Sequence, residues 1–495
     1  MYEPPYKPQP VAVSAGFRRL VLRTYPALAA APDERTAAYW RILQYVLFSL
    51  FADEYTGDTI LPYQTVAALV GVHPKSHGFN AGAWLAAFSR DVGLPLNPSD
   101  YCYLQGEART VRPQVDAAVL AALGDECRQR RVQGGQERVW FASGERVSRR
   151  GERDVQRAYE EQLAALSRSS VGPNHPARRL VEYFLHAPPD CLERVLKRNL
   201  PGVREKVAAL PVSTERERAK RHFCERLLVT LGSGSALGRM FYTGSERTPR
   251  VFAAGTSVHQ LPRDLRQKAF AGCYECDLRA AQLAIVARLW DIAPLQEFLE
   301  GGGSIWEELA GVAGVPAAEN KPILKRTVYS VVFGMGSKNV RAQLADGTIH
   351  GPGVGAVAAA RVLKHPLMRA LFGARRRVSR RVWGAGGARD TWGNWVPTAW
   401  GTTSDRNAER ERPVRDVPSV LAAVVQSYEM RLLLPVLGVI AAEPQVYLLS
   451  WLHDGVTLHL GNKEKANRHL RKLAAAVQKE ADAQAMTTRL EVTGL

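Results

Sequence analysis

Cysteine is scarce in this chain, with 6 residues among 495. So low a density does not make a disulfide scaffold, and it suits the reducing cytoplasm. Cys273 and Cys276 form a CxxC pair, but no second pair follows at the spacing of a zinc site. We therefore interpret both cysteines as strand residues rather than metal ligands.

Long apolar segments are also missing. No run of about 18 uncharged apolar residues occurs, so the sequence predicts no membrane-spanning helix. The first residues, MYEPPYKPQPVAV, lack the basic and then apolar pattern of a secretory signal. Together with the cysteine usage, these absences predict a cytoplasmic protein without a membrane partner.

Acidic residues are too few to balance the basic ones. Lys and Arg total 66 against 48 Asp and Glu, which gives a formal net charge of +18. Such an excess favours a polyanionic partner, nucleic acid first and an acidic membrane surface second. At 495 residues the chain is long enough for two to four domains, each with its own core.

The N-terminal half is predicted to be mainly helical. Residues 33–100 have helical patterns, and Tyr63–Asp91 contains two apolar-periodic segments joined by a Gly/His/Pro/Lys turn. This pattern fits a DNA-reading helix-turn-helix, and it fits any helical hairpin equally well. Glu126–Arg153 is basic and rich in glycine, as expected of a linker or a β-hairpin with basic strands. Helical patterns resume near Val155 and continue to Leu231.

Three segments of the C-terminal half carry chemistry. The first, Cys273–Trp290, begins with alternating side chains and ends as an apolar helix, with Asp277 at the change of pattern. Aspartate is a favoured N-cap, because its side chain accepts the free amide hydrogens of the first helical turn. A carboxylate at the end of a strand is also well placed to hold a metal ion, so both interpretations stand at this point.

The second segment, Glu319–Lys338, is predicted to be a helix. Asn320 suits its N-cap, Pro322 suits its first turn, and Gly334 with Gly336 can end it.

On such a helix, four side chains fall at four-residue intervals along one face: Lys321, Lys325, Tyr329 and Phe333. Two ammonium groups followed by two aromatic rings can bind a triphosphate at one end and stack on a base at the other. An ordinary amphipathic helix with a solvated lysine side would show the same pattern.

The third segment, Val446–Leu460, has two apolar runs flanking His453-Asp454-Gly455. Asp-Gly between such runs is a strong hairpin signal, so Asp454 can be a turn residue alone. If the hairpin pairs beside the strand of Asp277, the two aspartates meet in space. Two carboxylates from neighbouring strands can share two Mg²⁺ ions, which prefer oxygen ligands and assist phosphoryl transfer.

Taken together and in this order, the three segments resemble the family A DNA polymerases, the group of bacterial DNA polymerase I. DLRAAQLAIVARL looks like the family's first palm motif, KPILKRTVYSVVFGMG is similar to its fingers helix, and LHDGV is similar to its His-Asp-Glu motif. Thr248–Pro262 and Ala422–Leu434 resemble two further segments, one of them the family's Val-Gln-Gly-x3-Asp helix. The resemblance covers roughly residues 238–495.

The resemblance implies a role for each of these residues. Asp277 and Asp454 would be catalytic metal ligands, with the Leu278 carbonyl as a third ligand to two Mg²⁺ ions, or Mn²⁺ in their place. Lys325 would be catalytic and would contact the triphosphate of the incoming dNTP, with Lys321 beside it. Further nucleotide contacts would come from Tyr329, Phe333 and Gln282, and contacts to the DNA primer-template from Arg250, Gln426 and His453.

The chain departs from the family at three positions. Gln282 stands where the family has a glutamate, Gly455 replaces the glutamate of His-Asp-Glu, and Phe333 replaces a tyrosine. The fingers segment also looks like the matching helix of the bacteriophage single-subunit RNA polymerases. In the DNA enzymes that glutamate excludes the ribose 2′-hydroxyl and the tyrosine braces it. The departures therefore predict relaxed sugar selection, with dNTPs preferred and NTPs accepted.

The sequence thus predicts an α+β right-hand polymerase with a mainly helical N-terminal region. Residues 1–165 would form a basic accessory domain able to bind nucleic acid, and 166–495 the polymerase core. Within the core we expect a thumb near 166–240, a palm near 241–290 and 415–495, and fingers near 291–414.

Template-directed DNA synthesis by a two-metal mechanism is the leading function. Residues 1–240 contain no Asp-x-Glu, so we expect no proofreading exonuclease. The alternatives are a primase, primase-polymerase or single-subunit RNA polymerase that starts chains de novo, and a non-catalytic DNA-binding replication-initiation protein. We expect a phage or plasmid enzyme with a replicon-encoded helicase or processivity factor as a further partner.

Overall fold

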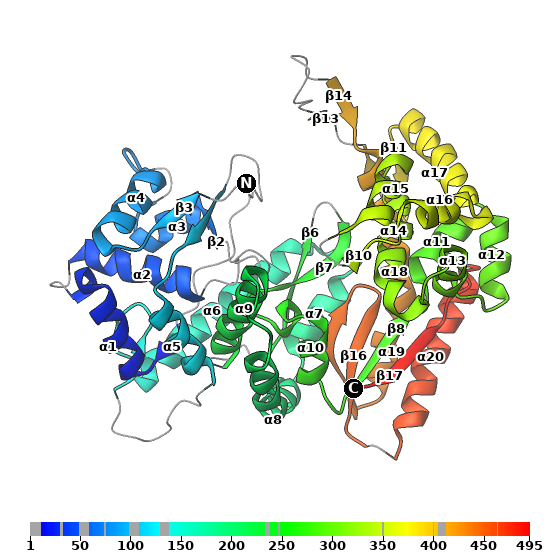
Figure 1. Cartoon of the computed structure of the whole chain (residues 1–495). Helices are drawn as coiled ribbons and strands as arrows, with labels where there is room; N and C mark the ends of the chain where they lie inside the picture. The colour runs from blue at the N-terminus through cyan, green and yellow to red at the C-terminus, as the bar shows by residue number, and fades with distance from the viewer. Residues whose placement is uncertain are drawn as a thin grey trace.

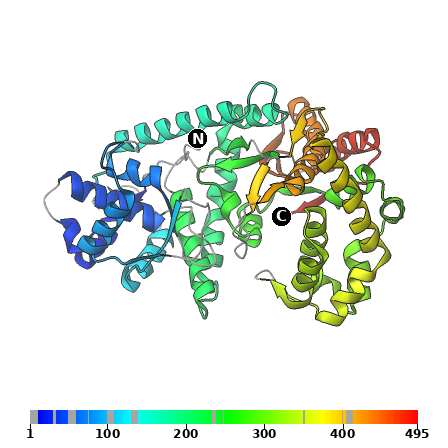
Figure 2. The same ribbon diagram turned by 90° about the horizontal axis from the view of Figure 1, so that it is seen from above.

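The computed structural model describes residues 11–29, 33–48, 59–73, 76–98, 108–128, 138–232, 238–245, 248–348, 351–398, 400–403, 412–462 and 464–495. The fold is mixed α+β with helices predominating, as the sequence predicts. The N-terminal elements lie at one end of the molecule (Figure 1). The C-terminal half lies at the other end, and the view from above shows the same separation (Figure 2).

The N-terminal elements surround a hydrophobic core of their own. They are β1 (Ala12–Val13), α1 (Ala15–Thr24), α2 (Glu34–Phe48), β2 (Thr59–Pro62), α3 (Tyr63–Val70), α4 (Ala81–Val92), β3 (Leu96–Pro98), β4 (Ala108–Pro113), α5 (Ala117–Arg128) and β5 (Trp140–Phe141). Three of the strands form an antiparallel sheet in the order β2-β4-β3. Val229, from a later helix, completes this core.

The helical pair predicted in Tyr63–Asp91 is present as α3 and α4, and residues 71–80 connect them. This connection is longer than the three or four residues of a simple helix-turn-helix. With α2 and the three-stranded sheet, the pair has the element order and strand pairing of a winged-helix domain.

The charge of the N-terminal region differs from the prediction. Residues 33–128 carry 7 Lys and Arg against 11 Asp and Glu, which gives a formal net charge of −4. Residues 1–165 as a whole carry 19 basic and 18 acidic residues, so the description of this region as basic is wrong. Its positive charge is confined to short segments such as Glu126–Arg153, and residues 166–495, with 47 basic and 30 acidic residues, hold the excess.

The described part of Glu126–Arg153 contains a short antiparallel hairpin at residues 139–147, one of the two predicted forms of this segment. β5 pairs antiparallel with β1, and Trp140 forms a bridge with Arg146. Residues 129–137 lie outside the described residues. Helix α6 (Arg149–Ser170) then begins six residues before the predicted Val155.

The central part of the chain is helical and leads to a β-hairpin. Its elements are α7 (Arg178–His186), α8 (Pro189–Ala208), α9 (Glu215–Gly232), β6 (Phe241–Ser245), β7 (Thr248–Ala254) and α10 (Arg263–Ala269). α9 packs on α5, and α8 packs on α10, so this region joins the N-terminal core to the C-terminal half. β6 and β7 pair antiparallel.

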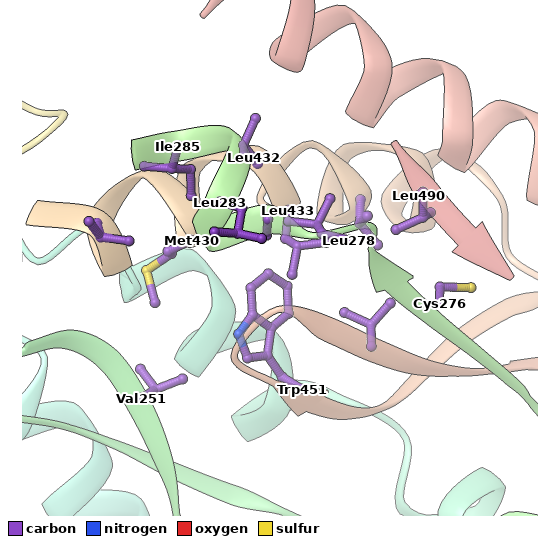
Figure 3. Close-up of a cluster of buried hydrophobic side chains, with 14 of the residues drawn as sticks. Val251, Cys276, Leu278, Leu283, Ile285, Met430, Leu432, Leu433, Trp451 and Leu490 are labelled. Carbon is purple, nitrogen blue, oxygen red and sulfur yellow. The ribbon is translucent and has the colours of Figure 1, made fainter. Parts of the chain in front are cut away.

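A four-stranded antiparallel sheet in the order β15-β16-β8-β17 is the centre of the C-terminal half. Its strands are β8 (Tyr274–Leu278), β15 (Val446–Leu452), β16 (Gly455–Leu460) and β17 (Leu490–Gly494), and the helices packed around it are α11 (Ala281–Leu289), α18 (Val417–Leu433), α19 (Pro435–Ala442) and α20 (Ala466–Ala483). Fully buried side chains fill the space between sheet and helices, with Trp451 beneath Leu283 and Met430 (Figure 3).

By length and composition alone, Val417–Ala442 could cross a membrane, with a mean hydropathy of 1.5. However, 61% of its most apolar window is buried inside the fold. It also carries Glu429 and Arg431, so we interpret α18 and α19 as core helices of this domain.

The remaining helices form a separate group next to the sheet. They are α12 (Ala293–Glu300), α13 (Ile305–Ala313), α14 (Ala317–Val332), α15 (Ser337–Asp346), α16 (Ala356–Lys364) and α17 (Pro366–Ala385), with the short strands β9 (Gly347–Thr348), β10 (Gly351–Pro352), β11 (Gly387–Arg389), β12 (Trp395–Pro397), β13 (Trp400–Thr403) and β14 (Arg412–Arg415). α14 packs on α13, α15 and α17.

The predicted helix of Glu319–Lys338 exists as α14, but its start differs from the prediction. Pro316 is the N-cap, so Asn320 is not, and the Asn320 amide instead donates to the Pro316 carbonyl at 3.0 Å. Ala317 and the two residues after it adopt helical geometry, so the helix begins earlier in the chain than predicted. Pro322 therefore lies inside the helix, where it removes one backbone hydrogen bond. The end at Gly334, with φ of +98°, agrees with the prediction.

Candidate active site

The two predicted aspartates lie on neighbouring strands. Asp277 is the fourth residue of β8 and pairs with Gly455, the first residue of β16. Asp454 occupies the two-residue turn between β15 and β16, and its carbonyl accepts a hydrogen bond from the Leu278 amide at 2.8 Å. His453 completes the turn with φ of +45°. The hairpin and its position beside the Asp277 strand agree with the sequence.

The alternative role of Asp277 as a helix cap is wrong. Helix α11 begins at Ala281, its N-cap is Ala280 in a left-handed conformation, and no side chain caps it. The Asp277 carboxylate is therefore not occupied by the helix, and it remains at the end of β8 facing the hairpin turn.

Negative charge is concentrated at Asp277. The pKa of the Asp277 carboxyl is raised to about 6, mainly by burial and also by the neighbouring Glu275 and Asp454 carboxylates. The positive charges of Arg263 and Lys325 oppose this effect. Several carboxylates that lie close together at a half-buried position attract a divalent cation.

The donor set fits Mg²⁺, which takes oxygen ligands and keeps several waters. Within the described ranges, no group of three or more His, Cys, Asp or Glu side chains could enclose a metal ion. A cation between Asp277 and Asp454 would thus complete its coordination with main-chain, water or substrate oxygens. Hard cations bound through one or two carboxylates plus phosphates coordinate in this way.

Helix α14 brings two of its predicted residues to the aspartates. Lys325 is exposed and acts electrostatically on Asp277, and its Nζ lies 5.6 Å from the centre of the Tyr329 ring. Burial raises the pKa of the Tyr329 hydroxyl, and the charges of Asp454 and Glu429 add to the rise. The Trp306 ring meets Tyr329 edge-on at 5.8 Å. Lys325 and Tyr329 therefore lie at the aspartate site.

Lys321 and Phe333 are less directly involved. Lys321 is exposed one turn before Lys325, and no contact joins it to the aspartates within the described residues. Phe333 follows the last residue of α14 and packs partly buried against the core.

Arg250, predicted to touch the primer, is held by a residue that the sequence analysis did not single out. The Arg250 guanidinium donates from Nε to Glu429 Oε2 at 3.0 Å and also from Nη2 to the same oxygen. Gln282 Nε2 donates to the other oxygen, Oε1, at 3.3 Å. The Glu429 side chain is only 1% exposed. Gln282 and Arg250, far apart in the sequence, thus share one buried carboxylate.

A signal for Glu429 exists in the sequence. On α18 it falls four residues after Val425 and three before Leu432, both of which are buried, so a carboxylate occupies a core position of an apolar helix. A buried charge is retained only where partners compensate its desolvation. Burial raises the pKa of Glu429, while Arg250 lowers it.

Gln426 and His453 both lie near Arg250. Thr248, on the strand of Arg250, donates its hydroxyl to Gln426 Oε1. His453 meets the exposed Phe252 ring edge-on at 5.3 Å, and burial together with the charge of Arg250 lowers its pKa to about 4. All three predicted primer contacts therefore gather where β7, α18 and the hairpin turn approach one another.

A basic surface lies on α17. Its exposed arginines are Arg369, Arg376, Arg377, Arg380 and Arg381, and none of them forms an ion pair within the described part of the chain. Two large aromatic side chains continue this surface, with Trp383 47% and Trp395 48% exposed. The Arg389 guanidinium lies 5.9 Å from the Trp395 ring. Arginines beside exposed rings are typical of surfaces that bind single-stranded nucleic acid.

Among known proteins, this chain is similar to solved structures only. No protein-family model matches the sequence, and no curated protein matches it. A solved structure does match, the POL domain of Pol1 from M. smegmatis in complex with DNA primer-template and dNTP. The TM-score is 0.45 and the identity 15%, over 69% of this chain and 72% of that chain. That neighbour is a family A DNA polymerase, the family whose motifs the sequence resembles. The likeness concerns the path of the chain and assigns no activity.

Proposed function

We propose that this protein is a template-directed DNA polymerase that adds nucleotides to a primer 3′ end. The observation that carries the proposal is the meeting of Asp277 and Asp454 on adjacent strands, with Lys325 and Tyr329 of α14 within electrostatic reach of them. Paired carboxylates beside a cationic and aromatic helix provide for metal ions, a triphosphate and a base at one site. A structural ion cluster would need neither the lysine nor the ring.

Asp277, Asp454 and the Leu278 carbonyl would hold two Mg²⁺ ions in this proposal. When bound, such ions activate the attacking oxygen and neutralise the charge on the leaving one. The aspartates supply the negative charge that fixes this position, and the crowding that raises the pKa of Asp277 favours a cation there.

The protein's own groups then orient the substrates. Lys325, with Lys321 one turn away, binds the triphosphate, and Tyr329 stacks on the incoming base. Arg250, Gln426 and His453 hold the primer terminus through minor-groove acceptors that all base pairs share, so contact needs no particular sequence. The primer 3′-hydroxyl gives its proton to solvent and its oxygen bonds to the α-phosphorus. The bond from that phosphorus to the oxygen bridging to the β-phosphorus breaks, and pyrophosphate leaves.

The nucleic-acid partner has support from charge. The excess of 47 basic over 30 acidic residues in 166–495 lies in the same part of the chain as the aspartates. The arginines of α17 add a surface with no acidic partner in the described structure. In the proposed division, the sheet with α11 and α18–α20 is the palm, α12–α17 are the fingers, and the helices of 166–240 are the thumb.

A second function within the same chemistry is the synthesis of RNA or of primers. Gln282 and Phe333 favour it, because neither residue completes the device that excludes ribonucleotides in the family that the sequence resembles. A non-catalytic initiation protein is less favoured, since residues 33–128, which include the N-terminal helical pair, have no excess of positive charge. The proposed enzyme thus prefers dNTPs, accepts NTPs, and has no proofreading activity.

Primer extension by the full chain tests the proposal. We expect Mg²⁺-dependent addition of dNTPs by the wild type, and none by Asp277→Ala or Asp454→Ala. Both variants should still bind duplex DNA, because binding rests on many basic residues. Asp482→Ala, an exposed carboxylate on α20, is the control. Normal extension by either active-site variant would refute the site, and separate reactions with NTPs and without a primer distinguish the alternatives.

A further inference from the structure

Gln282 and Glu429 form a hydrogen bond whose direction is fixed by chemistry. The Glu429 carboxylate accepts from Arg250 through Oε2 and from Gln282 through Oε1, so the Gln282 amide turns its NH₂ group toward it. The amide oxygen Oε1 then points the opposite way. Glu429 therefore determines which end of the Gln282 amide faces away from α18.

The freed oxygen has no partner. Gln282 is 8% exposed, and its Oε1 is buried without a hydrogen bond. The other such side-chain oxygens in the described ranges, on Thr59 and Thr327, belong to hydroxyl groups that can also donate. An amide oxygen can only accept a hydrogen bond, so burying it without a donor costs free energy. Such an atom in a folded protein needs an explanation.

The position of this amide gives that explanation. Gln282 is in the first turn of α11, directly after the Asp277 strand. Its partner Glu429 is close enough to Asp454 and Tyr329 that their charges interact. The amide thus borders the space enclosed by the aspartates and by the ring proposed to stack on the incoming base. The sugar of a nucleotide in that space lies between base and triphosphate, and we place this sugar beside Gln282.

We propose that Glu429 controls sugar selection by fixing the Gln282 amide so that Oε1 accepts a hydrogen bond from the sugar of the incoming nucleotide. A ribose 2′-hydroxyl satisfies this acceptor, whereas a deoxyribose offers no group at that carbon. Glu429 is a positioning residue that acts through Gln282. The inference rests on the proposed polymerase function and adds to it the origin of ribonucleotide acceptance.

Three variants of the full chain distinguish this positioning role of Glu429 from a purely structural role in holding Arg250. Gln282→Met keeps the size of the side chain and removes both amide atoms. Glu429→Gln keeps the shape and removes the charge, and because its amide can donate as well as accept, the Gln282 amide is free to turn. The third variant combines both changes. Glu480→Gln breaks the 2.7 Å pair with Arg431 of α18, away from Gln282, and is the matched control.

The readout is the ratio of kcat/KM for a matched dNTP and NTP. We expect Gln282→Met and Glu429→Gln each to raise this ratio in favour of dNTP by about two- to tenfold, the weight of one hydrogen bond. In the double variant, Glu429→Gln should add nothing to the effect of Gln282→Met, because the two residues act as one unit. Glu480→Gln should leave the ratio unchanged.

Two outcomes would overturn the inference. If Glu429→Gln slows dNTP and NTP addition equally, Glu429 is only a brace for Arg250, and if the two effects add in the double variant, the residues act separately. If Glu429→Gln does not fold, Arg250→Met with Glu429→Gln removes both charges of the pair, and the same ratio decides. A folded wild type that adds no nucleotide at all would refute the proposed function instead.

Discussion

The Asp277 side chain lies directly over the α-carbon of Gly455, its partner on the adjacent strand. A Cβ on Gly455 would overlap Asp277 Oδ1 and lie 3.0 Å from Asp277 Cγ and 3.2 Å from the Cys276 carbonyl oxygen. The absence of a side chain at 455 therefore makes room for the carboxylate that faces Asp454. The family that the sequence resembles has a glutamate at this position, and any side chain there would overlap Asp277 Oδ1 in this structure.

Gly455→Ala should therefore damage activity more than stability. The added methyl group meets the end of a side chain that can rotate, so Asp277 should turn away from Asp454 while the strands stay paired. We expect unfolding to be easier by about 1–3 kcal/mol and primer extension to fall at least tenfold. Gly455→Glu should be inactive, although it restores the family's residue.

Thermal unfolding and primer extension, measured together, check this prediction. Gly461→Ala is the control, because a Cβ there meets nothing closer than 3.6 Å just beyond the other end of the same strand. Full activity in Gly455→Ala would mean that the position of Asp277 in this structure is not the active one.

Local signals in the sequence predict much of this site. The Asp-Gly pair between apolar runs specifies the hairpin, and the alternation before Asp277 specifies its strand. Both are properties of neighbouring residues. The start of α14 differs from the prediction because Asn320 is a good cap and Ala317 a good helix former, and local preferences alone do not rank them.

The part that could not be predicted depends on contacts between distant segments. Glu429 follows Arg250 by 179 positions, and Gln282 precedes Glu429 by 147, so no spacing rule connects the three. The sequence marks Glu429 only as a charge on an apolar helix face. Which groups compensate that charge follows from the packing of α11 and β7 against α18.

A carboxylate at position 282 should be poorly tolerated. Gln282→Glu puts a second buried carboxylate about where the amide now lies, 3.3 Å from Glu429 Oε1, with Arg250 as the cation for both. We expect a loss of about 3 kcal/mol, as for other uncompensated buried charges. Adding Glu429→Gln should recover most of it, since one carboxylate then remains. Equal melting temperatures for the single variant and the wild type would contradict this view of the site.

The arginines of α17 should contribute to nucleic-acid affinity. Arg376→Gln with Arg380→Gln should weaken binding of a primer-template with a single-stranded overhang. The slope of log K against log salt should become shallower by about 0.7–0.9 for each phosphate that the variant no longer neutralises. The control is Arg471→Gln, an exposed arginine on α20. A salt slope equal to that of the wild type would show that this face does not bind nucleic acid.

The protein should not degrade primers. A 3′–5′ exonuclease holds its own metal ions with an Asp-x-Glu pair and further aspartates, and residues 1–240 contain no Asp-x-Glu. We expect a mismatched, labelled primer to stay intact with Mg²⁺ or Mn²⁺ when no nucleotides are present, and a labelled 5′ end to stay intact as well. Digestion by pure protein that persists in Asp277→Ala would reveal a nuclease site elsewhere in the chain.

Stability should fall on acidification through His259. Burial lowers the pKa of His259 to about 3, with Arg266 and His453 adding to the effect, and its Nε2 lies 2.6 Å from Ser450 Oγ. The unfolded chain takes up this proton near pH 6.5, so between pH 6.5 and 3 it binds more protons than the folded protein. The free energy of unfolding should therefore fall by up to about 1.4 kcal/mol per pH unit as the pH drops below 6.5. Above pH 6.5 this contribution is complete and constant. His259→Gln, which can still bond Ser450, should flatten the decline, and an unchanged pH slope in denaturant unfolding would show that His259 is protonated in the folded state.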